Sequence, residues 1–296
     1  MSVQAHFLPT WGERLQCFAP QPVATATGDM EYRRAGAQVI THVLLHGIGS
    51  GSASWLRQLE AAELTDGVGL LAWEAPGYAK SEAVAADQPD AGDYARRLWA
   101  WLDALKVGKP ITLVGHSLGA LIATRAAIHR PQQVARLVLL SPAQGYARAS
   151  IEERQKKLGE RLSNLQTLGV RGMAQKRGAA MLAPSAEPAL VRYVQTVMAQ
   201  LNPAGYTQAV HLLMGGDLLT DVKQVLALAS CPITVASGDL DTITPPAACQ
   251  IVAAIAGVTW VSLGATGHAC ALEASEKVNH LLGLTSCTEN IMETQT

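Results

Sequence analysis

Short apolar runs that alternate with helical stretches constrain the fold of this chain most strongly. Nearly continuous β-branched and apolar runs are typical of strands that are buried on both faces of a sheet. Such runs occupy residues 39–45, 69–73, 111–114, 137–140, 233–236 and 258–261, and helical stretches lie between several of them, at 94–105, 118–129 and 246–255. Because strand and helix alternate, the sequence predicts an α/β fold with a mostly parallel sheet covered by helices on both faces.

The alternation stops between residues 141 and 232. This stretch contains charge clusters and apolar residues at helical spacing, but no convincing strand. It is too long for a loop in a compact domain. We therefore expect residues 142–228 to form a helical cap inserted into a core made of residues 1–141 and 229–296. The first 30 residues, which are rich in proline, are expected to form an irregular arm that leads into a short hairpin.

The balance of charges limits what the chain can attract by electrostatics. It has 23 Lys and Arg against 24 Asp and Glu, a net charge of -1, so neither a nucleic acid nor an anionic membrane surface is expected as a partner. No apolar run reaches the roughly 18 residues of a transmembrane helix. The first residues lack the basic and then apolar order of a secretory signal. A small-molecule substrate is the expected partner, and the sequence leaves the oligomeric state open.

Cysteine usage and short motifs limit the chemistry further. The cysteines are odd in number, scattered and never spaced as Cys-x-x-Cys: Cys17, Cys231, Cys249, Cys270 and Cys287. Reduced thiols in a cytoplasmic protein fit this pattern, and a zinc site is not expected. There is no Gly-x-Gly-x-x-Gly after the first strand, no P-loop lysine and no cluster of metal ligands. We therefore expect neither a cofactor nor a metal.

The strongest chemical signal is the Gly-His-Ser-Leu-Gly segment at residues 115–119. It follows a buried strand and precedes a helix, which is the context of a nucleophile elbow. This turn lifts the Ser117 hydroxyl above the sheet edge, and the helix N-terminus beneath it favours negative charge. The alternative is a glycine-rich turn with an incidental serine. Because strand, turn and helix agree, Ser117 is the predicted nucleophile.

The turn after the first core strand predicts an oxyanion site. Residues 46–49, His-Gly-Ile-Gly, lie where such a sheet supplies its second backbone donor, the first being the amide after the nucleophile. We assign these donors to the amides of Ile48 and Leu118. Gly47 lets the backbone approach a substrate oxygen closely, and His116 either lines the substrate pocket or packs beside it. Gly47 and His116 are therefore the predicted substrate-binding residues.

A serine nucleophile needs a base, and the base needs an orienting carboxylate. On this type of sheet the order along the chain is nucleophile, acid, base. Asp239 and Asp241 follow the strand at 233–236, and His268 follows the last strand. Both segments leave the carboxyl ends of strands, where ligands gather in open α/β sheets. His268 is the predicted base, and spacing alone leaves the acid open between the two aspartates.

With these motifs, residues 32–284 resemble the α/β-hydrolase superfamily, in its form with a helical cap. The resemblance implies an acid third after a strand-end glycine, in a Gly-x-x-Asp-x-x-x-Pro pattern that maps here to Gly238, Asp241 and Pro245. It therefore favours Asp241 over Asp239. Residues 73–81 resemble the family's Asp-x-Pro-Gly-x-Gly-x-Ser turn, although this chain has Glu74 for the Asp. That turn is structural, so Glu74 is interpreted as a residue of the fold.

The resemblance also narrows the reaction. Haloalkane dehalogenases and epoxide hydrolases of this superfamily use an aspartate nucleophile, so Ser117 argues against both. Meta-cleavage-product hydrolases, which cut carbon–carbon bonds, often have Asn beside the serine, whereas this chain has His116. Similarity to carboxylesterases and enol-lactonases implies a serine hydrolase acting on a carboxylic ester, lactone or thioester. A carbon–carbon bond hydrolase and a non-catalytic hydrolase-like binding protein are the alternatives.

The expected cap suggests the kind of substrate. Its many Leu, Val and Met residues exceed what one thin helical layer needs, so some are expected to line an apolar pocket for a small to medium substrate. Flexible methionines suit a site of adaptable shape. Arg171, Arg177 and Arg192 are candidates to bind a substrate carboxylate, with an ordinary surface position as the alternative.

Overall fold

The computed structural model describes residues 10–228 and 231–285. The first six residues, which lack the order of a secretory signal, and Cys287 lie outside the described residues. Eight strands form one sheet in the order β1-β2-β4-β3-β5-β6-β7-β8. They are β1 (Gln21–Val23), β2 (Met30–Gly36), β3 (Ile40–Leu45), β4 (Gly69–Trp73), β5 (Ile111–His116), β6 (Val134–Leu140), β7 (Ile233–Ser237) and β8 (Val261–Ser262). β2 runs antiparallel to both of its neighbours, and the strands from β3 to β8 are parallel.

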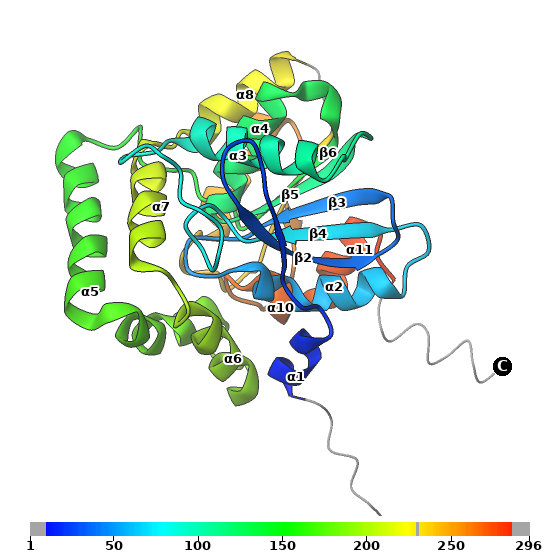
Figure 1. The fold of residues 1–296 in the computed structure, drawn as a ribbon. Helices are drawn as coiled ribbons and strands as arrows, with labels where there is room; N and C mark the ends of the chain where they lie inside the picture. The colour runs from blue at the N-terminus through cyan, green and yellow to red at the C-terminus, as the bar shows by residue number, and fades with distance from the viewer. Residues whose placement is uncertain (1–9, 229–230, 286–296) are drawn as a thin grey trace, which may run out of the picture.

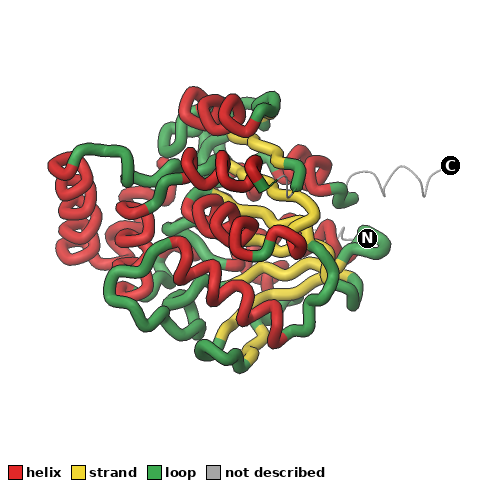
Figure 2. The backbone as a smooth tube through the Cα atoms, turned by 90° about the horizontal axis from the view of Figure 1, so that it is seen from above, coloured by secondary structure: helices red, strands yellow, loops and turns green. Residues whose placement is uncertain are grey.

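Helices cover both faces of this sheet, as the tube view in Figure 2 shows. One layer consists of α3 (Ala91–Ala104), α4 (Leu118–His129), α8 (Leu218–Ala227) and α9 (Pro246–Ala256). The other consists of α2 (Leu56–Glu63), α10 (Cys270–Glu273) and α11 (Ser275–Leu282). The predicted α/β fold is thereby confirmed. Within the described ranges, no helix combines the length and hydropathy needed to cross a membrane.

The sheet is held by side chains that the sequence supplies as continuous apolar runs. Every residue of β4 is buried, and Val43, Leu44 and Leu45 of β3 are completely inaccessible to solvent. Burial on both faces explains why these strands lack the polar alternation of a half-exposed strand. The central strands therefore form a rigid base, and the loops at their carboxyl ends are held in place by it.

The inserted stretch is helical and is divided between two environments. α5 (Ile151–Gly178) contacts both α6 (Pro188–Met198) and α7 (Pro203–Gly215) beside the sheet, at the left and lower left of Figure 1. α8 instead packs against α4 and α9. The division into a core and a cap at residues 142–228 stays a prediction, and within it α5, α6 and α7 are the helices that stand clear of the two layers.

The N-terminal arm and the last strand differ from what the sequence predicts. Part of the N-terminal arm is helical, as α1 (Trp11–Gln16), because Thr10 and Glu13 form a reciprocal capping box at its start. The expected hairpin follows as β1 and β2. The last strand is shorter than the apolar run at 258–261 suggests, since β8 is an edge strand that pairs with β7 through two residues.

Candidate active site

Ser117 lies at a sharp turn between β5 and α4. Its backbone has φ 53° and ψ −115°, a conformation that is strained for any residue with a side chain. The turn is fixed from both sides: the Ser117 amide donates to the Leu140 carbonyl (3.0 Å), and the Ser117 carbonyl accepts from the amides of Ala120 (3.0 Å) and Ala143 (3.2 Å). Strain that is held by such contacts is characteristic of a nucleophile elbow.

The glycine at the end of the motif is required by close packing. A Cβ atom on Gly119 would clash with the carbonyl oxygen of Leu45, the last residue of β3. Helix α4 can therefore begin directly against the end of β3 only because this position has no side chain. The same approach places the first turn of α4 next to the loop that follows β3.

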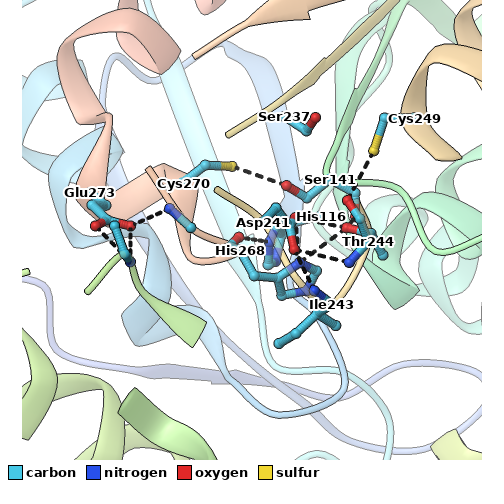
Figure 3. Close-up of polar contacts among 12 residues, drawn as sticks. His116, Ser141, Ser237, Asp241, Ile243, Thr244, Cys249, His268, Cys270 and Glu273 are labelled. Carbon is cyan, nitrogen blue, oxygen red and sulfur yellow. Dashed lines mark hydrogen bonds and ion pairs between the residues drawn. The ribbon is translucent and has the colours of Figure 1, made fainter. Parts of the chain in front are cut away.

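Asp241 and His268 come together although 27 residues separate them. His268 Nδ1 lies 2.8 Å from Oδ2 of Asp241, and both side chains are almost fully buried. The other carboxylate oxygen accepts from the backbone amides of Ile243 (2.8 Å) and Thr244 (2.9 Å). Figure 3 shows these contacts converging on the carboxylate. Asp241 can thus hold the His268 ring in one orientation.

The electrostatics of Asp241 favour its charged form. Burial by itself would raise the pKa of this carboxyl, but the hydrogen bonds from His268 and Thr244 and the interaction with His268 outweigh burial, so the pKa lies well below its ordinary value. Asp239, the alternative acid, is exposed and accepts a hydrogen bond from the Ser262 hydroxyl (2.6 Å). Of the two aspartates, Asp241 is therefore the one that contacts His268.

His116 lies against the back of His268. Its Nε2 is 2.7 Å from the His268 carbonyl oxygen, and the two rings are 4.8 Å apart. Burial, followed by the nearby His268, lowers the pKa of His116 to about 3, so its ring is neutral at ordinary pH. The ring also meets Trp55 edge-on in a small apolar hollow of about 20 Å³. His116 thus packs beside the His268 ring and contacts the His268 backbone.

The two amides assigned to oxyanion binding have no acceptor among the described residues. Leu118 is the first residue of α4, where helix geometry leaves its N–H without an intrahelical partner. Ile48 lines the same cavity as Ser117, and its carbonyl accepts from the Tyr78 hydroxyl (2.9 Å), which fixes the loop. Gly47 lies just behind: a Cβ atom there would be 3.0 Å from Cβ of Ser117.

The buried side chains of His46 and Glu74 hold the loop after β3 in place. His46 Nε2 accepts from the Ala75 amide (3.0 Å), while Nδ1 donates to the Gly47 carbonyl (2.8 Å). Burial lowers the pKa of His46 to about 4, which keeps the neutral ring that this pattern needs. Glu74 accepts from the Ser52 amide (3.1 Å) and from its hydroxyl. These contacts support the interpretation of Glu74 as a residue of the fold.

Ser117 opens into a cavity of about 240 Å³ between the sheet and the inserted helices. Its apolar lining includes Ile48, Met173, Met181, Met198, Leu201 and Leu213. Its polar lining includes Thr244 and the side chains of Tyr146, Tyr206, Arg161 and Arg177. Of the arginines named from the sequence, only Arg177 reaches this cavity within the described residues, whereas Arg171 and Arg192 are exposed.

Sequence reasoning did not identify Thr244 or Arg161. Thr244 has a local signal, because a threonine three residues after an aspartate can bond back to its side chain in a turn. Arg161 has none, since its position depends on how α5 bends. Cys249 and Cys270 are two buried cysteines close to Asp241, and burial raises the pKa of their thiols to about 11 and about 12, which favours the protonated form. In residues 10–228 and 231–285, no three His, Cys, Asp or Glu side chains are grouped as metal ligands would be.

Parts of this chain are similar in sequence to curated hydrolases. The (E)-2-((N-methylformamido)methylene)succinate hydrolase of Acinetobacter baylyi is 26% identical over 249 residues, which cover 81% of this chain and 88% of that protein. A 2-hydroxy-6-oxononadienedioate/2-hydroxy-6-oxononatrienedioate hydrolase of Paraburkholderia xenovorans is 31% identical over 118 residues, which cover 39% of this chain and 40% of that protein. Both are hydrolases by name.

Among solved structures, a thermophilic esterase from Thermogutta terrifontis superposes with a TM-score of 0.76 at 20% identity, covering 94% of this chain and 100% of that one. This likeness concerns the fold. The model of the alpha/beta hydrolase family matches residues 43–281, which include the Ser117 turn, Asp241 and His268. The chain therefore belongs to the alpha/beta hydrolase family and is an enzyme of that family.

Proposed function

We propose that this protein is a serine hydrolase that cleaves a carboxylic ester, lactone or thioester. In this mechanism Ser117 Oγ attacks the carbonyl carbon while His268 takes its proton. The amides of Ile48 and Leu118 bind the oxyanion of the tetrahedral intermediate. His268 then gives the proton to the leaving alcohol or thiol, which leaves an acyl group on Ser117. A water molecule, deprotonated by His268, attacks the acyl group and releases the acid.

One observation carries this proposal: the strained Ser117 turn opens into the same cavity as Ile48, while the paired Asp241 and His268 leave the same edge of the sheet. A buried carboxylate on Nδ1 fixes the tautomer in which Nε2 can accept a proton. It also stabilises the imidazolium that forms when Ser117 reacts. These two effects of the carboxylate matter for a His268 ring that exchanges a proton with Ser117, as the proposed mechanism requires.

The cavity also supports a substrate of small to medium size. Residues 142–228 act in this proposal as the cap, because the inserted helices supply the methionines on the far side of the cavity from the sheet. Its lining is mainly apolar with few polar groups, which is typical of small-molecule sites. An acyl or ring portion would pack against these methionines while its carbonyl lies over Ser117.

The second candidate is hydrolysis of a carbon–carbon bond in an aromatic-ring cleavage product. It is favoured by the likeness to the Paraburkholderia enzyme, although that match covers 39% of this chain. The two reactions separate cleanly in an assay. Turnover of p-nitrophenyl esters is compared with turnover of a vinylogous 1,5-diketone acid, and we expect the esters to react and the diketone acid to remain intact.

The decisive experiment labels the nucleophile. A fluorophosphonate probe should modify Ser117 in the native protein and should leave the Ser117→Ala variant unlabelled, with peptide mapping to identify the site. The variant should lose about 10⁴-fold or more in kcat/KM for esters. Ser163→Ala, an exposed serine on α5, is the matched control. Labelling elsewhere, or ester turnover that survives in Ser117→Ala, would refute the mechanism.

A further inference from the structure

In the described part of the chain, the charged residues that line the cavity beside Ser117 are both cations. They are Arg161 and Arg177, and no carboxylate lies beside them in the lining. The phenols of Tyr146 and Tyr206 line the same cavity. A mainly apolar site with two guanidinium groups and no acidic residue is complementary to an anion.

A break in α5 brings the two arginines to one cavity. They are 16 residues apart, which in an unbroken helix would place them about 24 Å from each other along the axis. Gly169, with φ 61° and ψ 176°, interrupts the helix between them. The chain turns there, as the bend at the lower end of α5 in Figure 1 shows. Arg161 precedes Gly169 and Arg177 follows it, so they lie on opposite sides of the break. The conformation at Gly169 is one that side chains disfavour.

Neither arginine has a counter-ion in the part of the chain that the structure describes. Many arginines of this chain are paired with carboxylates: Arg57 with Glu60, Arg125 with Asp221, Arg130 with Asp103, and Arg148 with Asp217. No ion pair or hydrogen bond joins the side chain of Arg161 or Arg177 to any group in residues 10–228 and 231–285, and Nη1 of Arg161 is buried without a partner. Both guanidinium groups are half-buried, so each loses part of its hydration, and the buried Nη1 of Arg161 is left with a hydrogen bond to donate.

The electrostatics of the pair agree with this geometry. Burial, followed by repulsion from Arg161, lowers the pKa of Arg177, whereas the nearby Tyr206 and Tyr146 act in the opposite direction. Two cations that repel each other in a half-buried site gain most from one anion held between them. A planar carboxylate suits two guanidinium forks, because each fork can donate two parallel hydrogen bonds.

We propose that Arg161 and Arg177 bind a carboxylate of the substrate, so that the preferred substrate is an ester-type compound with a second, free carboxylate away from the bond that is cleaved. This proposal rests on the proposed serine hydrolase function and names its substrate class. The cavity holds the scissile carbonyl at Ser117 and the free carboxylate at the bend of α5. The apolar segment that joins these two groups packs against the methionines.

The kinetic test uses matched pairs of p-nitrophenyl esters from succinate to suberate. One member of each pair ends in a carboxylate and the other in a methyl group at the same chain length. Wild-type kcat/KM should favour the carboxylate member of at least one pair by about 10- to 100-fold, the size of a charge-assisted contact. Arg161→Gln and Arg177→Gln should each reduce that ratio by about tenfold or more.

Two sets of control variants test whether the preference for the carboxylate ester depends on Arg161 and Arg177 in particular. Arg171→Gln and Arg192→Gln remove exposed arginines from α5 and α6, and we expect them to leave the ratio unchanged. Arg177→Lys keeps the charge but loses the bidentate fork, so it should recover part of the preference. A ratio near one in the wild type, or a ratio that is the same in Arg161→Gln and Arg177→Gln as in the wild type, would overturn the proposal.

A binding test separates this inference from the proposed reaction. Calorimetry with the Ser117→Ala variant compares glutarate with the neutral diamide of the same length, with and without Arg161→Gln. If glutarate binding needs Arg161 while the wild type cleaves no ester, the carboxylate site is kept and the serine hydrolase function is rejected. If the wild type cleaves esters but Ser117→Ala binds glutarate and its diamide equally well, the serine hydrolase function is kept and the carboxylate site is rejected.

Discussion

The hydroxyl of Thr244 lies 2.8 Å from Oδ2 of Asp241, the same oxygen that bonds to His268. It is also 3.1 Å from Nδ1 of His268 and 3.0 Å from the Ser141 carbonyl oxygen. The carboxylate is therefore surrounded by two backbone amides on one oxygen, and by a hydroxyl and an imidazole on the other. Figure 3 shows Thr244 and His268 on either side of it. Thr244 therefore contacts both members of the Asp–His pair, and we expect it to position them.

Removing this hydroxyl should slow the reaction. Thr244→Val keeps the shape but loses the hydrogen bond to a charged group, so we expect kcat/KM for esters to fall about tenfold or more. Thr244→Ser restores the hydroxyl and should restore most of the activity. Equal activity of the valine and serine variants, each checked for folding by its thermal midpoint, would show that the hydroxyl does not position Asp241.

The two aspartates after β7 should differ strongly in their effect on activity. Asp241→Asn removes the charge that fixes and stabilises the His268 ring, and should reduce kcat by about 10³- to 10⁴-fold. Asp239→Asn is the matched control, because that carboxylate is exposed and bonds to Ser262. Steady-state ester kinetics on both variants decide the assignment, and a larger loss for Asp239→Asn would move the acid to that position.

Buried histidines should make the fold sensitive to acid. The pKa of His116 is about 3 and that of His46 about 4 in the folded protein, mainly because of burial, whereas an unfolded histidine titrates near 6.5. Their neutral rings contribute stability that is complete above about pH 6.5 and is lost as the pH falls towards 4. Each should contribute about 1.4 kcal/mol per pH unit to the loss in this window.

Urea titrations at several pH values between 7 and 4.5 measure this slope. His46→Gln should have a lower free energy of unfolding at pH 7, because the Ala75 and Gly47 contacts are disturbed. Its loss of stability on acidification should nevertheless be shallower than that of the wild type, since one titrating group is gone. An equally steep loss in the variant would mean that His46 does not account for the acid sensitivity.

The sequence predicted the sheet well because each central strand is an apolar run buried on both faces, a local pattern that tertiary packing reinforces. Ser117 and His268 were proposed for a similar reason: Ser117 follows β5 directly and His268 lies in the loop after β8, so the sheet determines the edge at which both lie. Asp241 needed the family pattern, since two aspartates separated by one residue give the same local signal.

The cavity was harder to predict because it depends on long-range geometry. Arg161 and Arg171 lie on the same helical stretch with similar local surroundings, yet one reaches the cavity and the other faces solvent. The difference arises at Gly169, where the helix breaks and redirects the chain. A glycine within a helical pattern signals a weak point, but the direction of the bend is set by packing against α6 and α7.

Met198 should set how much apolar substrate the cavity accepts near Ser117. Its side chain is buried and lines the cavity together with Ile48 and Ser117. The terminal methyl carbon of Met198 lies so close to Gly49 that a Cβ atom on Gly49 would be only 3.0 Å from it. Along a p-nitrophenyl series from acetate to dodecanoate, we expect an optimum at intermediate length in the wild type, because the cavity is of limited volume.

Truncating this methionine should move the optimum. Met198→Ala enlarges the space next to the scissile carbonyl, so longer acyl chains should gain in kcat/KM relative to shorter ones. Met214→Ala is the matched control: Met214 is equally buried on α7 but is absent from the lining of this cavity. Both variants should lose about 2–5 kcal/mol of stability, so a shift of the optimum in Met198→Ala alone reports on the cavity. Activity that rises without limit towards dodecanoate in the wild type would indicate an open surface instead.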